Sequence, residues 1–229
     1  MNVLKDIQGV ILDMDGTLLD SMPIWHEIDM RFFAENGLTI PEGLSEQVNK
    51  MSMEEWAAFF VREFGISLTE QDVIRRIEEM AAEYYEHKIP LKPYVLPFLD
   101  ALDTAGLPYG IATATYRSSA HAALQRLGIA ERMQFILTAE DVPGGKTTPE
   151  MYRQAAKRLS TDLAHTLIVE DALHCVEMAV RCGYITAAVH DACCPAAEWA
   201  EICRLTPLHG ETLCEVLEQL CKSQDTIIV

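Results

Sequence analysis

The chain has 229 residues, a length that suits a core domain with a smaller domain inserted in it or appended to it. Hydrophobic residues make up 49% of the sequence, which is enough for a buried core and argues against disorder. The formal net charge of −17 would repel nucleic acids and anionic membranes, so neither is an expected partner, and a phosphate site would need its own nearby cations.

Targeting and redox features of the sequence favour a cytoplasmic protein. No stretch is long and apolar enough to span a bilayer, and residues 1–16 lack the pattern of a secretory signal. An odd number of cysteines without a C-x-x-C pair indicates free thiols rather than disulfides or a zinc site. All seven cysteines lie in the last quarter of the chain, at Cys175, Cys182, Cys193, Cys194, Cys203, Cys214 and Cys221.

Five short apolar runs, each bounded by turn or polar residues, have the character of buried parallel strands. These runs are residues 10–12, 109–112, 135–137, 167–169 and 187–189. Helical patterns lie between the later runs, and three of them end just before a glycine, as helices with a left-handed cap do. Strands that alternate with helices predict an α/β fold with a doubly wound parallel sheet.

Residues 22–88 break this alternation because one helical pattern follows another. A capping box at 52–55 and a polar run at 69–72 mark the starts of two of these helices. A helical block between the first and second strands predicts a small all-helical domain inserted into the α/β core. We expect the core to comprise residues 1–17 and 90–229, and the inserted domain to comprise residues 18–89.

Asp13 and Asp15 directly follow the first predicted strand, in the run Asp-Met-Asp-Gly-Thr. Asp13 could attack a phosphorus atom, and Asp15 could then protonate the leaving oxygen. A carboxylate that attacks a phosphate anion needs its charge neutralised, so this chemistry requires a divalent cation. Gly16 would allow the backbone to approach a ligand closely. Taken alone, the run is equally compatible with a plain turn after a strand.

Two adjacent acids, Glu170 and Asp171, follow the strand predicted at 167–169. Buried acids at a strand end are costly unless they are paired, and a hard cation is an obvious partner. Asp171 could also simply cap the next helix, but capping does not explain Glu170.

Thr113 ends the second predicted strand, where its hydroxyl and the loop amides that follow, including that of Ala114, could bind a phosphoryl oxygen. Lys146 lies just before a helix start predicted at 148–149, where its charge could offset that of Asp13 and of a phosphate. Each residue alone could be an ordinary turn residue or a solvated lysine. Because ligands of open α/β sheets bind outside the carboxyl ends of the strands, these signals together predict one site.

The order Asp-x-Asp-Gly-Thr, Thr, Lys-x-x-Pro-Glu and Glu-Asp resembles the four motifs of the haloacid dehalogenase-like superfamily, and the likeness covers nearly the whole chain. The closest likeness is to its β-phosphoglucomutase and phosphoglycolate phosphatase branch, which implies a Rossmann-like core with a small helical cap. The resemblance implies Asp13 as nucleophile and Asp15 as general acid/base. It also implies that Thr113 and Lys146 hold the phosphoryl group.

The same resemblance implies a bound Mg²⁺. Its ligands would be the Asp13 carboxylate, the backbone carbonyl of Asp15 and Asp171, with Glu170 near or in the coordination shell. Dehalogenases of this superfamily lack the second aspartate of the first motif, so Asp15 argues against dehalogenation.

Three departures from the family pattern concern mainly the substrate. The third motif reads Lys-Thr-Thr-Pro-Glu from Lys146 where Lys-Pro-x-Pro-Asp is common, and Trp25 stands where the hinge usually has a histidine. The stretch 48–53 lacks the glycine and arginine found in the mutase cap. The position of that arginine corresponds best to Met53, with Lys50 about one helical turn away.

We therefore expect a magnesium-dependent phosphatase that hydrolyses a small phosphorylated metabolite through a phospho-aspartyl intermediate. The first alternative is a β-phosphoglucomutase-like phosphomutase, which would need a cap cation for a second phosphate. A non-catalytic binding protein ranks below both, because a degenerate copy would be expected to have lost one of the motif residues. The oligomeric state is not predicted, although a monomer is compatible with the sequence.

Overall fold

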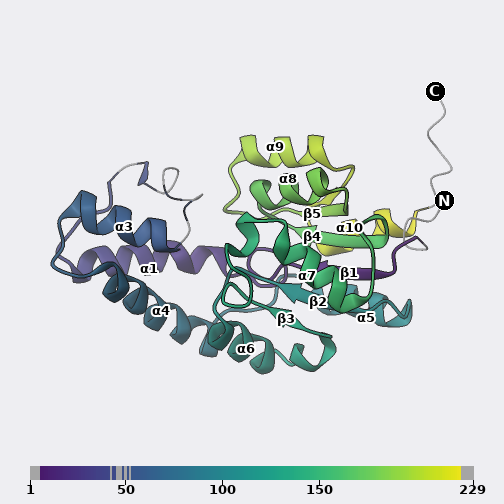
Figure 1. Cartoon of the computed structure of the whole chain (residues 1–229), viewed down its shortest axis with the longest axis horizontal. Coiled ribbons are helices and arrows are strands. Elements are labelled where there is room, and N and C mark those ends of the chain that lie inside the picture. Colours follow the sequence, from purple (N-terminus) through teal and green to yellow (C-terminus); the bar gives the residue numbers. More distant parts are fainter. Residues whose placement is uncertain (1–5, 42, 45–47, 49–50, 52, 223–229) are drawn as a thin grey trace. The chain divides into compact units, whose positions relative to one another are not determined.

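The computed structural model describes residues 6–41, 43, 44, 48, 51 and 53–222. Contacts within the chain divide it into two compact units (Figure 1). The first unit comprises Met1–Met22 and Ile89–Val229, and the second comprises Pro23–Lys88. The helical domain predicted at 18–89 encloses the second unit.

The first unit contains a sheet in which the six strands of the described residues all run parallel. The strands are β1 (Gly9–Leu12), β2 (Tyr109–Ala112), β3 (Ile136–Leu137), β4 (Thr166–Glu170), β5 (Ile185–Val189) and β6 (Leu208–Gly210). Their order across the sheet is β3-β2-β1-β4-β5-β6, so the chain winds outward from β1 in both directions (Figure 1). The predicted doubly wound parallel sheet is confirmed.

Burial along the strands explains which of them the sequence predicts. Every residue of β1, β2 and β4 is buried, as expected for strands covered on both faces. The sequence does not predict the edge strand β6, because its residues Leu-His-Gly contain no apolar run and two of the three are only half-buried.

In the described part of the chain, the first unit has six α-helices, of which the first five precede or connect strands and the last follows β6. They are α5 (Val95–Thr104), α6 (Arg117–Arg126), α7 (Glu150–Leu159), α8 (Leu173–Cys182), α9 (Ala196–Leu205) and α10 (Leu213–Cys221). Met151 and Tyr152 of α7 belong to one buried hydrophobic cluster with Ile11 of β1 and Ile168 of β4. The packing of α7 on the two central strands places the segment before α7 at the carboxyl edge of the sheet.

The second unit contains three long helices that share an aromatic core. They are α1 (Met22–Glu35), α3 (Met53–Phe64) and α4 (Glu70–His87). Phe60 of α3 packs edge-on against both Phe32 and Phe33 of α1, with ring centroids 4.9 Å apart in each pair. Thr69 and Asp72 form a capping box that starts α4. The capping box predicted at 52–55 includes Ser52, which lies outside the described residues.

Two linker segments of the first unit run side by side where the chain leaves and re-enters it. Leu19 and Leu91 form an antiparallel bridge. The Asp20 amide donates to the Pro90 carbonyl at 3.0 Å, and the Lys92 amide donates to the Leu18 carbonyl at 2.9 Å. This pairing ties Lys92 to the segment that follows Asp15.

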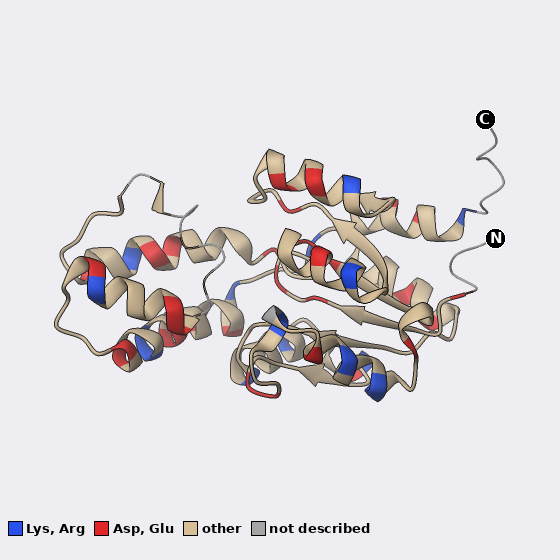
Figure 2. Ribbon diagram, turned by 45° about the horizontal axis from the view of Figure 1, so that its top comes forward, with Lys and Arg blue, Asp and Glu red and all other residues tan. Residues whose placement is uncertain are grey.

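Acidic and basic residues occur along the helices of both units (Figure 2). Several cations pair with neighbouring acids, among them Arg76 with Glu35 at 2.8 Å and Arg132 with Asp103 at 2.6 Å. Exposed pairs of this kind add at most about 1 kcal/mol each to stability. Of the helices that the structure describes, none has the length and apolar character needed to cross a membrane.

Candidate active site

Three neighbouring strands end at the same edge of the sheet and deliver the predicted residues to it. Asp13 follows β1, and its amide continues the ladder by donating to the Val169 carbonyl of β4 at 3.0 Å. Thr113 follows β2 in the same way, and Glu170 is the last residue of β4. Asp13, Thr113 and Glu170 are all buried. The parallel register therefore brings together residues that lie more than 150 positions apart in the sequence.

Lys146 reaches the same edge from the 3₁₀ turn Gly145–Thr147, which precedes α7. Its side chain is only 7% exposed, and its ammonium group contacts the carboxylates of both Asp13 and Glu170. Burial alone would lower the pKa of Lys146, but the charges of Asp13 and Glu170 outweigh burial and hold that pKa well above its usual range. Lys146 is therefore a fixed positive charge between two buried acids.

Asp13, Glu170 and Asp171 form a compact buried cluster of acids. One carboxylate oxygen from each lies within 4.8 Å of the others. Burial raises the pKa of Glu170 to about 7, and burial together with the charge of Asp13 raises the pKa of Asp171 well above its usual range. Lys146, which contacts two of the three acids, lowers both pKa values but does not cancel these effects.

The geometry of this cluster fits a hard divalent cation. Asp13 Oδ2 and Glu170 Oε2 are buried and have no hydrogen-bond partner among the described residues. Asp171 is oriented by a hydrogen bond of 3.3 Å from the Thr17 hydroxyl. Carboxylate oxygens are the donors that Mg²⁺ and Ca²⁺ prefer. The cluster thus offers unused oxygen donors, and its three acids share a single lysine.

Gly16 makes room for Asp171 in this cluster. A Cβ atom at Gly16 would lie only 2.1 Å from Asp171 Oδ2, and the Gly16 backbone has a φ of 82°. Both the close approach and the left-handed backbone require glycine. The glycine of the first motif is therefore explained by the position of an acid from the fourth motif.

The side chain of Asp15 contacts two threonines that follow β2. The Thr115 hydroxyl donates to Asp15 Oδ2 at 2.5 Å, and the Thr113 hydroxyl approaches the same oxygen at 3.4 Å. Ala114 lies exposed between these threonines. That the Asp15 carbonyl is a metal ligand, and that Ala114 binds phosphate, stay predictions.

Two residues that the sequence reasoning did not place in the site contact it directly. The Lys92 ammonium donates to the Gly16 carbonyl at 2.6 Å, to the His190 carbonyl at 2.8 Å and to Asp191 Oδ2 at 3.0 Å. The Tyr152 hydroxyl donates to Glu170 Oε1 at 2.8 Å. Asp191 lies just after β5, so the same pattern of polar residues after strands could have predicted it as a site residue.

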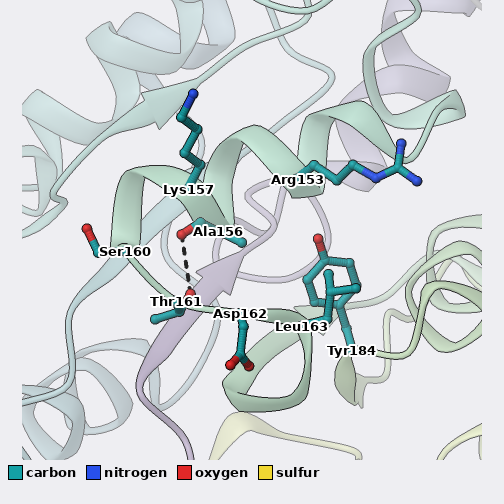
Figure 3. A pocket seen from close by; sticks show the side chains of 8 residues that line it. All are labelled: Arg153, Ala156, Lys157, Ser160, Thr161, Asp162, Leu163 and Tyr184. Carbon is teal, nitrogen blue, oxygen red and sulfur yellow. Dashed lines mark hydrogen bonds between the residues drawn. The ribbon is translucent and has the colours of Figure 1, made fainter.

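A separate pocket of ≈ 500 Å³ lies at the other edge of the sheet. Its lining residues are Arg153, Ala156, Lys157, Ser160, Thr161, Asp162, Leu163 and Tyr184, as Figure 3 shows. The segment of residues 160–163 leads into β4, and Tyr184 immediately precedes β5, so these parts of the lining belong to the amino ends of the strands. The pocket is thus distinct from the carboxylate site.

Known proteins resemble this chain in fold and in sequence. CbbY from Rhodobacter sphaeroides, solved in complex with phosphate, has a similar fold, with a TM-score of 0.79 at 22% identity over 93% of this chain and 99% of that one. N-acetylmuramic acid 6-phosphate phosphatase of Pseudomonas aeruginosa is 32% identical over 186 residues, which are 80% of this chain and 81% of the relative. Hexitol phosphatase B of Escherichia coli is 26% identical over 76% of this chain and 79% of the relative.

The family model of the haloacid dehalogenase-like hydrolases matches residues 10–189, which include all the predicted site residues. The match begins inside β1 and ends with β5, so it spans the sheet edge where the acids and Lys146 meet. The chain belongs to the haloacid dehalogenase-like hydrolases and is a phosphohydrolase of that family.

Proposed function

We propose that the protein is a magnesium-dependent phosphatase that releases inorganic phosphate from a small phosphorylated carbohydrate. The observation that carries this proposal is the contact of Lys146 with both Asp13 and Glu170 inside a buried cluster of three acids. The carbohydrate class is supported by the names of two relatives, a phosphatase of N-acetylmuramic acid 6-phosphate and a hexitol phosphatase.

The proposed reaction has two displacements at phosphorus. An Asp13 carboxylate oxygen attacks, the bond from phosphorus to the sugar oxygen breaks with its electron pair going to that oxygen, and Asp15 supplies the proton. Water then attacks the phosphorus of the phospho-aspartate, Asp15 takes the proton of the water, and Asp13 leaves with its electron pair. Both halves use Asp15, first as acid and then as base.

Electrostatic stabilisation in this proposal comes from groups already oriented in the fold. Lys146 would offset negative charge on Asp13 and on the phosphoryl oxygens, while Thr113 and the amides after it donate to those oxygens. Asp13 and Asp171, with Glu170 beside them, would hold Mg²⁺, which supplies further positive charge for the phosphoryl group.

The second unit is proposed as the cap that selects the substrate. It is inserted between β1 and β2, and paired linkers connect it to the α/β unit. A phosphomutase would need a cap cation for its second phosphate. Met53, the best match to that position, begins α3 and is uncharged, and Lys50 lies outside the described residues. The lack of a charge at Met53 supports water, rather than a sugar phosphate, as the acceptor of the phosphoryl group.

The test is a screen of the purified protein for phosphate release from a panel of phosphomonoesters, with sugar 6-phosphates and hexitol phosphates included. We expect turnover of carbohydrate phosphates that requires Mg²⁺ and stops in excess chelator. A second arm supplies β-glucose 1-phosphate, Mg²⁺ and a trace of the bisphosphate. If glucose 6-phosphate appears much faster than free phosphate, the protein is a phosphomutase and not a phosphatase. Full activity in excess chelator would refute the proposed dependence on Mg²⁺.

A further inference from the structure

A pair of threonine hydroxyls after β2 surrounds one oxygen of Asp15. The Thr115 hydroxyl donates to Asp15 Oδ2 at 2.5 Å, and the Thr113 hydroxyl lies 3.4 Å from the same oxygen. The Thr115 amide in turn donates to the Thr113 hydroxyl at 3.0 Å, which fixes the turn that carries both side chains. The shorter of the two contacts to Asp15 is thus made by the residue that no motif of the sequence singled out.

The fold holds the two partners in register. β1 and β2 are adjacent parallel strands, paired at Leu12 and Ile111, so the segments that follow them leave the sheet together. On the Asp15 side, the backbone is fixed by a bridge to Leu19 and by a hydrogen bond of 2.9 Å from the Gly16 amide to the Leu19 carbonyl. The backbone is therefore set by these local contacts, while the threonines contact the side chain.

We propose that Thr115 is a positioning residue that holds the Asp15 carboxyl in the orientation from which it serves the leaving group. The proposal deepens the proposed function and rests on it, because Asp15 is the general acid there. Proton transfer needs the carboxyl oxygen within about 2.6–3.2 Å of its target, so a rotated aspartate loses catalysis although it remains in the site. Fixing the side chain in the fold removes the entropy cost of ordering it in the reaction.

This role predicts a dependence on the leaving group that a general loss of structure would not produce. A sugar alkoxide is a poor leaving group and needs a proton as the bond to phosphorus breaks. The p-nitrophenolate anion is a good leaving group and departs with little help from an acid. The loss of the Thr115 hydroxyl should therefore slow a sugar phosphate much more than p-nitrophenyl phosphate.

The decisive variant is Thr115→Val, which keeps the shape of the side chain and removes its hydroxyl. Losing a hydrogen bond to a charged group corresponds to roughly a ten- to hundredfold change. We expect kcat/KM for an alkyl phosphate, such as glucitol 6-phosphate, to fall by about that factor relative to p-nitrophenyl phosphate. Thr115→Ser, which retains the hydroxyl, should restore the wild-type ratio of the two rates.

Two control variants are measured alongside Thr115→Val on the same two substrates. Thr104→Val also removes a threonine hydroxyl, one that donates to the Asp100 carbonyl within α5, and should leave both rates unchanged. Asp15→Asn should shift the ratio of rates in the same direction as Thr115→Val, and further. If Thr115→Val unfolds, as judged by circular dichroism, Thr115→Ala takes its place in the same comparison.

Failure of the positioning role of Thr115 and failure of the proposed phosphatase function would give different results. Equal losses on both substrates in Thr115→Val, or no recovery in Thr115→Ser, would overturn the positioning role while Asp15→Asn still shows the acid at work. A wild-type protein that hydrolyses neither substrate with Mg²⁺ would overturn the proposed function, and the role of Thr115 with it.

Discussion

Lys146 is one positive charge between two buried carboxylates, and much of the site depends on it. Without a cation, Asp13 and Glu170 would repel each other in a medium where charges are weakly screened. Even with Lys146 in place, burial keeps the pKa values of Glu170 and Asp171 raised, so one lysine does not compensate the charge that three ionised acids would carry. Lys146 contacts Asp13 and Glu170, and the carboxylate oxygens that it does not contact remain available to bind a metal.

The nucleophile assignment predicts a large loss from a small change. Asp13→Asn keeps the shape of the side chain but leaves a weakly nucleophilic amide where the carboxylate would attack phosphorus. We expect phosphate release to fall by at least about a thousandfold, which is at the low end for the loss of a nucleophile. Stopped assays of released phosphate measure this, with circular dichroism to verify the fold. A variant that retained a tenth of the wild-type rate would remove Asp13 from its role.

Tyr152 should influence metal binding through Glu170, to which its hydroxyl donates. Partners that orient a metal ligand typically change the affinity about 10–100-fold when removed, so Tyr152→Phe should weaken Mg²⁺ binding by at least about tenfold. Isothermal titration calorimetry with Mg²⁺ alone measures this without any substrate.

The chain offers a matched control for that variant. Tyr184 packs against Tyr152 with ring centroids 6.1 Å apart, and its buried hydroxyl has no hydrogen-bond partner in the described structure. Tyr184→Phe should therefore bind Mg²⁺ as the wild type does. Equal affinities of the two variants would show that the Tyr152 hydroxyl does not orient Glu170.

At the scale of elements, the turn after β1 links two motifs through Gly16. Gly16→Ala would place a Cβ atom against Asp171 Oδ2 and strain a backbone with a φ of 82°. Gly183, the cap of α8, has a similar φ of 87°, and a Cβ atom there would meet no atom within 4 Å, so Gly183→Ala isolates the strain. Gly183→Ala should lose about 1–2 kcal/mol of unfolding free energy in urea titrations, and Gly16→Ala should lose more because of the added contact.

The two glycine variants should differ in function. Gly16→Ala should also lose Mg²⁺ affinity in calorimetry, because Asp171 must move away from the new methyl group. Gly183→Ala should retain that affinity. If Gly16→Ala bound Mg²⁺ as well as Gly183→Ala does, Asp171 would not be held where the structure has it.

Elements with a strong local signal could be predicted from the sequence, and contacts between them could not. The strands through Leu12, Ile111 and Val169 have apolar runs, and parallel strands deliver the residues after them to one edge, so Asp13 and Glu170 could be placed together. β6 has no such run. Thr115, Lys92 and Tyr152 carry no signal of their own, because each contact depends on how a turn, a linker or a helix packs against distant residues.

At the scale of the whole molecule, the net charge of −17 and the acid cluster predict two different responses to salt. General repulsion is screened by any ion, whereas the cluster should bind Mg²⁺ specifically. At 100 times its Kd, a ligand stabilises the folded state by about 2.7 kcal/mol, and each kcal/mol shifts the Tm of a protein of this size by about 2–4 °C.

Mg²⁺ should accordingly raise the Tm of the α/β unit by several degrees, with saturation, in differential scanning calorimetry. Sodium chloride at matched ionic strength should give a smaller rise without saturation. In Asp171→Asn, the saturable part should disappear while the response to sodium chloride persists. Identical curves for the two salts in the wild type would argue against a specific cation site.

Trapping the covalent intermediate tests the central claim most directly. Borohydride reduces the acyl carbon of a phospho-aspartate to an alcohol, so an aspartate phosphorylated during turnover becomes homoserine. The protein is mixed with Mg²⁺ and its best carbohydrate phosphate, treated with borohydride, digested and analysed by mass spectrometry. The account predicts homoserine at position 13 only when substrate is present, and none in Asp13→Asn. Turnover without modification at Asp13, or with modification at Asp15 instead, would contradict it.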